Sequence, residues 1–244
     1  MNPIDQFNKE KANNINKIGN NSKLKQIGKD FFIKTAPNQY SYNFSWMGRP
    51  IIALPQDMIA MQELIWEIKP DLIIETGIAH GGSIVYYASL LELIGKDGLV
   101  VGIDIDIRKH NRKLIEAHPV MKRIKMIEGS SVDHDVVKQV SEIAASKKRI
   151  MVCLDSNHTH DHVLEELNLY TPFVTLNSYC IAFDTIIEDM PENAFPDRPW
   201  GKGNNPKTAV YKYLKTHSEF EIDKSIQNKL LITVAPDGYL KRIK

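Results

Sequence analysis

The segment Asp71 to Ser83 constrains the fold of this chain more than any other part of it. Its sequence, DLIIETGIAHGGS, begins with a short apolar run that ends at Glu75 and is followed by a turn containing Gly77, Gly81 and Gly82. Apolar β-branched residues bounded by proline and glycine are typical of a buried parallel strand. Because Ser83 to Ile94 has the composition of a helix, we expect a strand, a glycine-rich turn and a helix whose N-terminal amides face a polar or anionic ligand.

The spacing of these glycines favours one kind of ligand over another. Three residues, Ile78 to His80, separate Gly77 from the next glycine, which differs from the G-x-G-x-x-G turn of NAD-binding proteins. An acidic strand end followed by a longer glycine turn suits S-adenosylmethionine, whose ammonium group needs a carboxylate and whose carboxylate needs backbone N–H donors. An ordinary strand–helix turn uses similar glycines, so this segment alone leaves both interpretations open.

Composition and charge limit the class of protein and its partners. The chain has 244 residues, of which 43% are hydrophobic, and this is long enough for one α/β core. A formal net charge of +1 argues against a general nucleic-acid or anionic-membrane surface and favours small-molecule partners. Cys153 and Cys180 fall in expected buried strands, which favours free thiols. With a polar N-terminus and no apolar run long enough to span a membrane, the chain is expected to be cytoplasmic.

The first 40 residues are expected to form a helical arm or lid, and residues 41–244 the catalytic domain. Met1 to Lys34 is polar, with apolar residues spaced for one or two amphipathic helices that break near Gly19 to Ser22. A solvated arm with a packing stripe is the favoured interpretation; a lid or a homo-oligomer contact is the alternative. The alternating aromatic residues that follow predict either an edge strand or the wall of an acceptor pocket: Tyr40, Tyr42, Phe44 and Trp46.

Further apolar segments predict a doubly wound, mostly parallel sheet that closes with an antiparallel pair of strands. The second to fifth parallel strands are expected at LVVGID ending in Asp104, Arg123–Ile127, Arg149–Leu154 and Ser178–Ala182. The antiparallel pair is expected at Phe220–Asp223 and Leu230–Ala235. A ligand would then lie across the carboxyl ends of the parallel strands.

Two of these strand ends are candidates for nucleoside recognition. In a doubly wound sheet, an acidic residue at the end of the second strand can accept hydrogen bonds from ribose hydroxyls, which favours Asp104 over its competitor Asp106. The loop after the third strand borders the adenine, where Ser131 can bond a ring nitrogen. The alternative is a cap for the helix that follows, which Ser131 or Asp133 could supply equally well, and both roles are compatible.

The fourth and fifth strand ends carry the densest chemistry in the chain. Asp155 and Asp184 should emerge side by side, and hard carboxylate ligands select Mg²⁺ or Ca²⁺. His158 can then take the proton of an acceptor hydroxyl. A zinc or iron site using His158, His160 and His162 is the less favoured alternative, because the last two fall in the first turn of a helix. The proline-rich segment Thr185–Pro206 is expected to be a lid on the acceptor side, with Trp200 as a wall.

Several motifs together resemble a known family. From about Tyr40 to the C-terminus, the chain resembles the cephalosporin hydroxylase-like class I S-adenosylmethionine-dependent O-methyltransferases, which are related to macrolide-sugar methyltransferases. The motifs that carry the resemblance are WMGRPIIALPQDM, ETGIAHGGS, EGSS, LDSNHTHDHV and APDGYLKR. The resemblance implies a Rossmann-like sheet, mostly parallel with an antiparallel C-terminal strand. It also implies Mg²⁺-assisted methyl transfer to a hydroxyl of a sugar or glycosylated metabolite.

The resemblance also assigns roles to residues. His158 matches the general base, with Asp155 as its catalytic partner, and Asp155 and Asp184 match metal ligands. The residues implied to bind the cofactor are Glu75, Gly77, His80, Gly81, Gly82, Ser83, Asp104, Ser131 and Asp155.

One position departs from the family pattern. The family reads Glu-Asp at the end of the fifth strand, whereas this chain reads Phe183-Asp184. A metal would be held more weakly, completed by another oxygen such as a water or Glu188, or absent. Two alternative functions follow: a noncatalytic S-adenosylmethionine-binding homologue that has lost its chemistry, and, less favoured, an NAD-dependent oxidoreductase.

Overall fold

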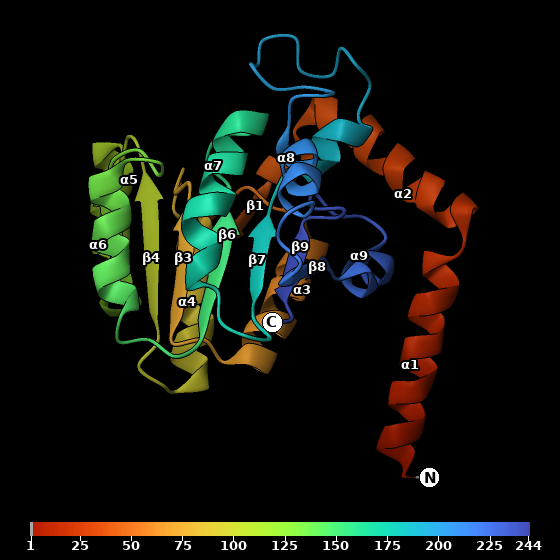
Figure 1. Cartoon of the computed structure of the whole chain (residues 1–244), viewed down its shortest axis with the longest axis horizontal. Coiled ribbons are helices and arrows are strands. Elements are labelled where there is room, and N and C mark those ends of the chain that lie inside the picture. The colour runs from red at the N-terminus through yellow and green to blue at the C-terminus, as the bar shows by residue number, and fades with distance from the viewer. Residues whose placement is uncertain (1) are drawn as a thin grey trace.

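A seven-stranded sheet runs through the centre of the protein in the computed structural model, which describes residues 2–244 (Figure 1). Its strand order is β5-β4-β3-β6-β7-β9-β8. The sheet consists of β3 (Leu72–Thr76), β4 (Leu99–Asp104), β5 (Ile124–Glu128), β6 (Ile150–Leu154), β7 (Tyr179–Ala182), β8 (Phe220–Ile222) and β9 (Tyr239–Arg242). All neighbouring pairs are parallel except the two that β9 forms with β7 and β8. This is the doubly wound, mostly parallel sheet with an antiparallel C-terminal strand that the sequence predicted.

Helices cover both faces of the sheet. They are α3 (Pro55–Ile68), α4 (Gly82–Ile94), α5 (Lys109–Glu116), α6 (His134–Ala144), α7 (His160–Tyr170), α8 (Pro206–Tyr213) and α9 (Lys224–Leu230). Successive side chains of a strand point to opposite faces. Ile73 therefore packs in a core with α3 and α4, whereas its neighbours Leu72 and Ile74 pack in a second core with α6, α7 and α8.

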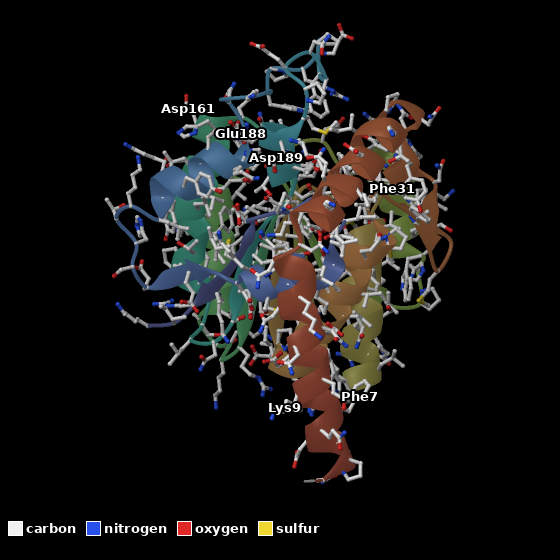
Figure 2. All side chains as sticks on the ribbon, turned by 90° about the vertical axis from the view of Figure 1, so that its right-hand side faces the viewer. Phe7, Lys9, Phe31, Asp161, Glu188 and Asp189 are labelled. Atoms are coloured by element: carbon white, nitrogen blue, oxygen red, sulfur yellow. The ribbon has the colours of Figure 1, made fainter. Side chains whose placement is uncertain are left out.

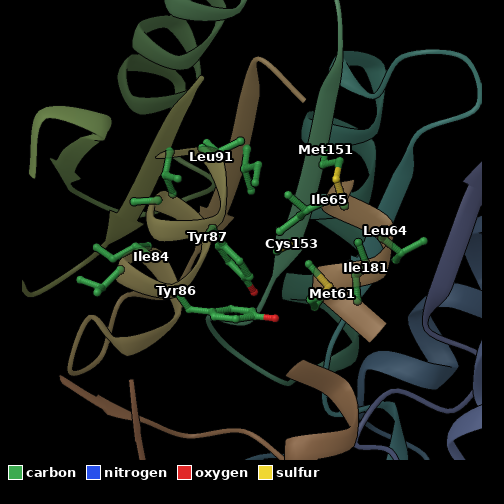
Figure 3. Close-up of a cluster of buried hydrophobic side chains, with 14 of the residues drawn as sticks. Met61, Leu64, Ile65, Ile84, Tyr86, Tyr87, Leu91, Met151, Cys153 and Ile181 are labelled. Atoms are coloured by element: carbon green, nitrogen blue, oxygen red, sulfur yellow. The ribbon is translucent and has the colours of Figure 1, made fainter. Parts of the chain in front are cut away.

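The core on the α3 and α4 face lies directly beneath the strand ends that carry the predicted site. Figure 3 shows Met61 and Ile65 of α3, Tyr87 of α4 and Cys153 of β6 gathered in this layer. Both Cys153 and Cys180 are buried and free, as predicted. Close packing of buried side chains resists displacement, so this layer holds the strand ends in place.

The closing strand pair is one place where the sequence-based prediction was wrong. Leu230–Ala235 was expected to be a strand, but the second strand of the pair is β9, which begins at Tyr239. The backbone N–H of Val234 and the hydroxyl of Thr233 both donate to the carboxylate of Asp57 on α3. This segment is therefore anchored to a side chain of α3 instead of joining the sheet.

The N-terminal arm consists of two helices, α1 (Pro3–Gly19) and α2 (Ser22–Thr35), which break where the sequence predicted. Figure 2 shows both helices in front of the body, with Phe7 and Lys9 on the part of α1 near its N-terminal end. A small hairpin of β1 (Phe44–Trp46) and β2 (Arg49–Ile51) then leads into α3. Within residues 2–244, no helix combines the length and apolar character that crossing a membrane requires.

Candidate functional site

A cavity of about 480 Å³ opens at the carboxyl ends of β3, β6 and β7. The chain order of the strands reverses at β3, which lies between β4 and β6, and ligands of doubly wound proteins bind at such a reversal. Most of the predicted site residues line this cavity: Glu75, Gly77, His80, Gly82, Ser83, Asp155, His158 and Asp184. The structure thus brings together residues that lie as far apart as positions 75 and 184.

Glu75 is the most distinctive residue of this cavity. Its side chain is only 1% exposed, and the Ser83 hydroxyl donates to Oε2 at 2.6 Å. The other oxygen, Oε1, has no partner among residues 2–244. Burial raises the pKa of Glu75 to about 8, although the nearby hydroxyls of Ser83 and Tyr87 act in the opposite direction. A buried carboxylate oxygen without a partner is costly, so this position fits a ligand that brings a cationic donor such as an ammonium group.

The glycine turn allows the ends of β3 and β6 to approach each other. Gly77 has φ +91°, and a Cβ atom at this position would lie 2.1 Å from the backbone oxygen of Asp155. Any larger side chain would therefore separate the two strand ends. Gly77 therefore permits the close approach of backbone at this edge of the sheet.

Asp104 lies at the end of β4, but its carboxylate faces the glycine turn. Oδ2 accepts hydrogen bonds from the backbone N–H groups of Ile78 at 2.8 Å and Ala79 at 3.1 Å. Oδ1 accepts from the N–H of Asp106 at 3.1 Å. Asp104 is absent from the cavity wall formed by the described residues. Its observed part is to hold the turn, and its contact with a ribose stays a prediction.

Ser131 and Gly81 also lie outside the cavity wall that the described residues form. The Ser131 side chain is buried, and its hydroxyl lies 3.1 Å from Nε2 of His162. The same His162 nitrogen lies 3.1 Å from the Ser156 hydroxyl, next to Asp155. Ser131 therefore connects two loops at the edge of the site, and its adenine contact stays a prediction.

Asp155, His158 and Asp184 form a compact cluster at the neighbouring ends of β6 and β7. One ligand atom from each lies within 4.8 Å of the others, and Nε2 of His158 is 3.1 Å from Oδ2 of Asp184. Burial raises the pKa of Asp155 well above its ordinary value, and the negative charge of Asp184 raises it further. Asp184 has φ +55°, a left-handed conformation that is strained for a residue with a side chain. The predicted pairing of these strand ends is confirmed by the β6–β7 ladder.

The donor atoms of this cluster suit a divalent cation. Among the described residues, this is the only group of three or more His, Cys, Asp or Glu side chains close enough to share an ion. Phe183 lines the cavity but offers no ligand atom. Glu188 does not replace the missing carboxylate, because its Oε2 accepts from Gly203 at 2.8 Å and from Asn205 at 2.5 Å.

The alternative site with several histidines is not formed within residues 2–244. Nδ1 of His160 lies 2.7 Å from the Thr208 hydroxyl, which joins α7 to α8. His162 contacts Ser156 and the buried Glu166. These contacts agree with the mostly structural roles predicted for His160 and His162.

A second cavity, of about 510 Å³, adjoins the first. His158, Asp184 and Trp200 line both cavities, so they lie where the two meet. The Trp200 ring packs edge-on against His158, with 4.8 Å between the ring centroids. Tyr40 and Tyr42 line the second cavity, while Phe44 and Trp46 belong to the β1–β2 hairpin. The strand alternative therefore holds for Phe44 and Trp46. The acceptor-pocket alternative stays a prediction for Tyr40 and Tyr42.

Sequence reasoning missed the residues that hold the glycine turn from outside. Arg49 is buried and donates to the backbone oxygen of His80 and, at 2.9 Å, to Oδ1 of Asn111. Asn111 in turn donates to the backbone oxygen of Ala79 at 3.0 Å. These residues lie 31 and 32 positions from their partners in the turn. Their only signal was that Arg49 belongs to a run shared with the resembled family.

A family model described as "Rhamnosyl O-methyltransferase/CmcI" matches residues 38–243 of the chain. The protein belongs to the rhamnosyl O-methyltransferase/CmcI family. A rhamnosyl O-methyltransferase of Mycobacterium bovis is 31% identical over 191 residues, covering 76% of this chain and 73% of the relative. A rhamnosyl O-methyltransferase of Mycobacterium leprae is 29% identical over 201 residues, covering 81% and 82%. The predicted resemblance is confirmed, and the protein is an O-methyltransferase of this family.

Solved structures support the fold. An apo structure of CmcI covers 83% of this chain and 77% of its own, with a TM-score of 0.60 at 18% identity. A CmcI structure with Mg and SAM gives a TM-score of 0.59 at 19% identity, covering 83% and 78%. An O-methyltransferase from Bacillus cereus in complex with SAH gives 0.52 at 13% identity, with 92% of each chain covered. These similarities confirm the class I methyltransferase fold that the sequence predicted for this protein.

Proposed function

We propose that this family member transfers a methyl group from S-adenosylmethionine to a hydroxyl of a sugar, with a rhamnosyl group as the first candidate. The observation that carries the proposal is the buried Oε1 of Glu75, which has no partner among the described residues and lies in the same cavity as the Asp155, His158 and Asp184 cluster. One end of the cavity thus suits the donor's ammonium, and the other suits a reacting hydroxyl. The curated relatives, named as rhamnosyl O-methyltransferases, support the choice of sugar.

On the donor side, the chain supplies a charge partner and a shaped turn. Glu75 binds the ammonium, and Ser83 fixes the orientation of its carboxylate. The N-terminus of α4, which begins at Gly82, presents backbone N–H groups to the donor's carboxylate. Arg49, Asn111 and Asp104 keep the turn in this shape. The proposed part of Asp104 therefore includes support of the turn as well as ribose binding.

On the acceptor side, His158 accepts the proton of the reacting hydroxyl. Asp184, 3.1 Å from Nε2, stabilises the imidazolium that results, and the edge of Trp200 restricts the ring. Methyl transfer is an in-line displacement, so holding the hydroxyl oxygen opposite the sulfonium supplies a large part of the rate. Trp200 and His158 lie where both cavities meet, which suits this positioning.

A divalent cation fits the same cluster. Asp155 and Asp184 would hold Mg²⁺, and the ion would lower the pKa of a coordinated acceptor hydroxyl. A bound cation would also offset the repulsion between these two carboxylates, which raises the pKa of Asp155. Because Phe183 supplies no oxygen, we expect weaker binding than a third carboxylate would give.

The test is incubation of the protein with S-adenosylmethionine and a panel of glycosides, including rhamnosides, hexosides and a sugar nucleotide. Formation of S-adenosylhomocysteine and the mass of each glycoside are followed together, with and without EDTA. We expect a gain of one methyl group on a rhamnoside. Binding of S-adenosylmethionine without transfer to any glycoside would contradict the sugar assignment, whereas binding of NAD in its place would contradict the donor assignment.

A further inference from the structure

We infer that α2 of the N-terminal arm forms a wall of the acceptor site and binds an apolar group attached to the methylated sugar. The inference rests on the proposed function, and it adds a substrate class and a specificity element to it. The second cavity is lined by Phe32, Ile33 and Thr35 at the C-terminal end of α2. The same cavity is also lined by His158 and Asp184. One continuous space thus joins the arm to the reacting groups.

The lining of this cavity is mostly apolar away from the reacting groups. Besides Phe32 and Ile33, its walls include Met190 and Phe195 from the loop before α8. Asp184 and Arg198 are the only Asp, Glu, Lys or Arg side chains among its described lining residues. Arg198 lies over the Trp200 ring, 5.2 Å from its centroid. A sugar offers hydroxyls to the polar end, but the end formed by α2 suits an apolar substituent.

The size of the cavity agrees with a substituted sugar. Its volume of about 510 Å³ lies within the range of pockets that hold drug-sized ligands, roughly 300–1,000 Å³. A single sugar ring is smaller than such ligands and would leave the apolar end unfilled. An aglycone with an aromatic ring or an alkyl chain would occupy that end.

The arm is built into the body and is not a loosely attached segment. A Cβ atom at Gly28 would lie 2.6 Å from the backbone oxygen of Leu231, so α2 packs against the segment after α9 without space for a side chain. The rings of Phe31 and Tyr40 pack edge-on with centroids 5.4 Å apart, and Tyr40 packs in the same way on Phe44 at 5.3 Å. Phe31 is visible on α2 in Figure 2. These contacts fix the position of Phe32 and Ile33.

The arm also lies outside the part of the chain that the family model matches. That match begins at residue 38, whereas α2 ends at Thr35. The wall formed by α2 is therefore a feature outside the matched domain. We assign to α2 the selection of the acceptor by its apolar group.

The test compares methyl, phenyl and octyl rhamnoside, the last below its micelle concentration, as ligands of the full-length protein saturated with S-adenosylhomocysteine. Calorimetry is expected to show phenyl and octyl rhamnoside binding at least about ten-fold more tightly than methyl rhamnoside, because burial of each apolar carbon adds affinity. Phe32→Ala and Ile33→Ala should each reduce this preference to about three-fold or less. The matched control is Ile27→Ala on the same helix, since Ile27 is 60% exposed and should leave the preference unchanged.

Equal affinity of the wild-type protein for the three rhamnosides would overturn the inference, as would failure of the phenyl and octyl compounds to bind. An equal effect of Ile27→Ala and Phe32→Ala would also overturn it. Turnover with S-adenosylmethionine is measured on the same samples. Methylation of all three rhamnosides at one rate would uphold the proposed function while refuting the part assigned to α2.

Discussion

At the scale of single residues, Glu75 determines how the donor site responds to pH. Because its pKa is raised to about 8, the side chain is mostly protonated at pH 7 in the free protein. An ammonium group binds the ionised carboxylate, so donor binding must release a proton at pH 7. The affinity for S-adenosylmethionine should accordingly rise as the pH increases from 6 to about 8.

Glu75→Gln should remove the charge partner of the ammonium group and the proton release that accompanies donor binding. We expect the affinity for S-adenosylmethionine to fall by about ten- to hundred-fold at pH 8, since a charge-assisted hydrogen bond is lost. Calorimetry in buffers with different ionisation enthalpies measures the affinity and the proton release together. Glu142→Gln, on the exposed face of α6, is the control. If Glu75→Gln binds the donor as tightly as the wild type, Glu75 does not hold the ammonium.

His158 is expected to act on transfer and not on donor binding. His158→Ala should slow transfer by about 10²- to 10⁴-fold, the usual contribution of a general base. The dissociation constant of S-adenosylmethionine should stay within about two-fold, because Glu75 and the glycine turn remain intact. Single-turnover kinetics and calorimetry separate the two quantities, and His134→Ala, at an exposed position, serves as the control. An equal loss of donor affinity and rate would show that His158 organises the donor site instead.

At the scale of structural elements, Asp57 joins α3 to the segment that precedes β9. Its carboxylate accepts hydrogen bonds from the Thr233 hydroxyl, from the Val234 N–H at 2.9 Å and from the Tyr239 hydroxyl at 2.9 Å. Asp57→Ala leaves these donors buried without a partner, so we expect the free energy of unfolding to fall by about 3 kcal/mol. Urea denaturation at pH 7 measures the change, and Asp161→Ala, at an exposed position of α7, should change it by less than about 0.5 kcal/mol.

Asp57 also makes stability depend on pH. Burial raises its pKa to about 6 in the folded protein, above the unfolded value of about 3.9. Because the pKa is higher in the folded protein, protonation of Asp57 stabilises the folded state. This contribution to the free energy of unfolding is complete below about pH 4 and is lost as the pH rises through 6. Asp57→Asn should flatten the stability profile between pH 4 and 6. A profile for Asp57→Asn that is parallel to the wild type would show that other groups cause the dependence.

The same elements show what the sequence could and could not predict. Glu75, Asp155 and Asp184 each follow an apolar run directly, so strand order alone placed them at one edge of the sheet. The support of the glycine turn by Arg49 and Asn111 depends on tertiary contacts that have no local pattern. Leu230–Ala235 was wrongly predicted as a strand because its apolar content is typical of one. In the structure, the N–H of Val234 donates to Asp57 of α3 and not to a neighbouring strand.

At the scale of the whole molecule, the site combines the carboxyl ends of β3, β6 and β7, the loop before α8 and the arm. Its charged side chains come from segments that lie far apart in the sequence. Among the described residues, Asp155 and Asp184 offer carboxylates for one cation, and Phe183 offers none. We expect EDTA to lower the transfer rate and Mg²⁺ to restore it. Phe183→Glu should lower the Mg²⁺ concentration needed for half-maximal rate by about ten-fold, because it adds a hard oxygen ligand. The control Phe183→Leu should not. Full activity in EDTA, with no effect of Phe183→Glu, would contradict a metal-assisted reaction.

The central claim is that the cluster of Asp155, His158 and Asp184 holds a sugar hydroxyl beside the methyl donor, so that the methyl group is transferred to that hydroxyl. The most direct test is mass spectrometry of phenyl rhamnoside after incubation with S-adenosylmethionine that carries a deuterated methyl group. We predict that the wild-type protein places one deuterated methyl group on a ring hydroxyl, and that His158→Ala, which still binds the donor, does so at least about 100-fold more slowly. An unlabelled product, or labelling at the same rate by the wild type and His158→Ala, would contradict the account.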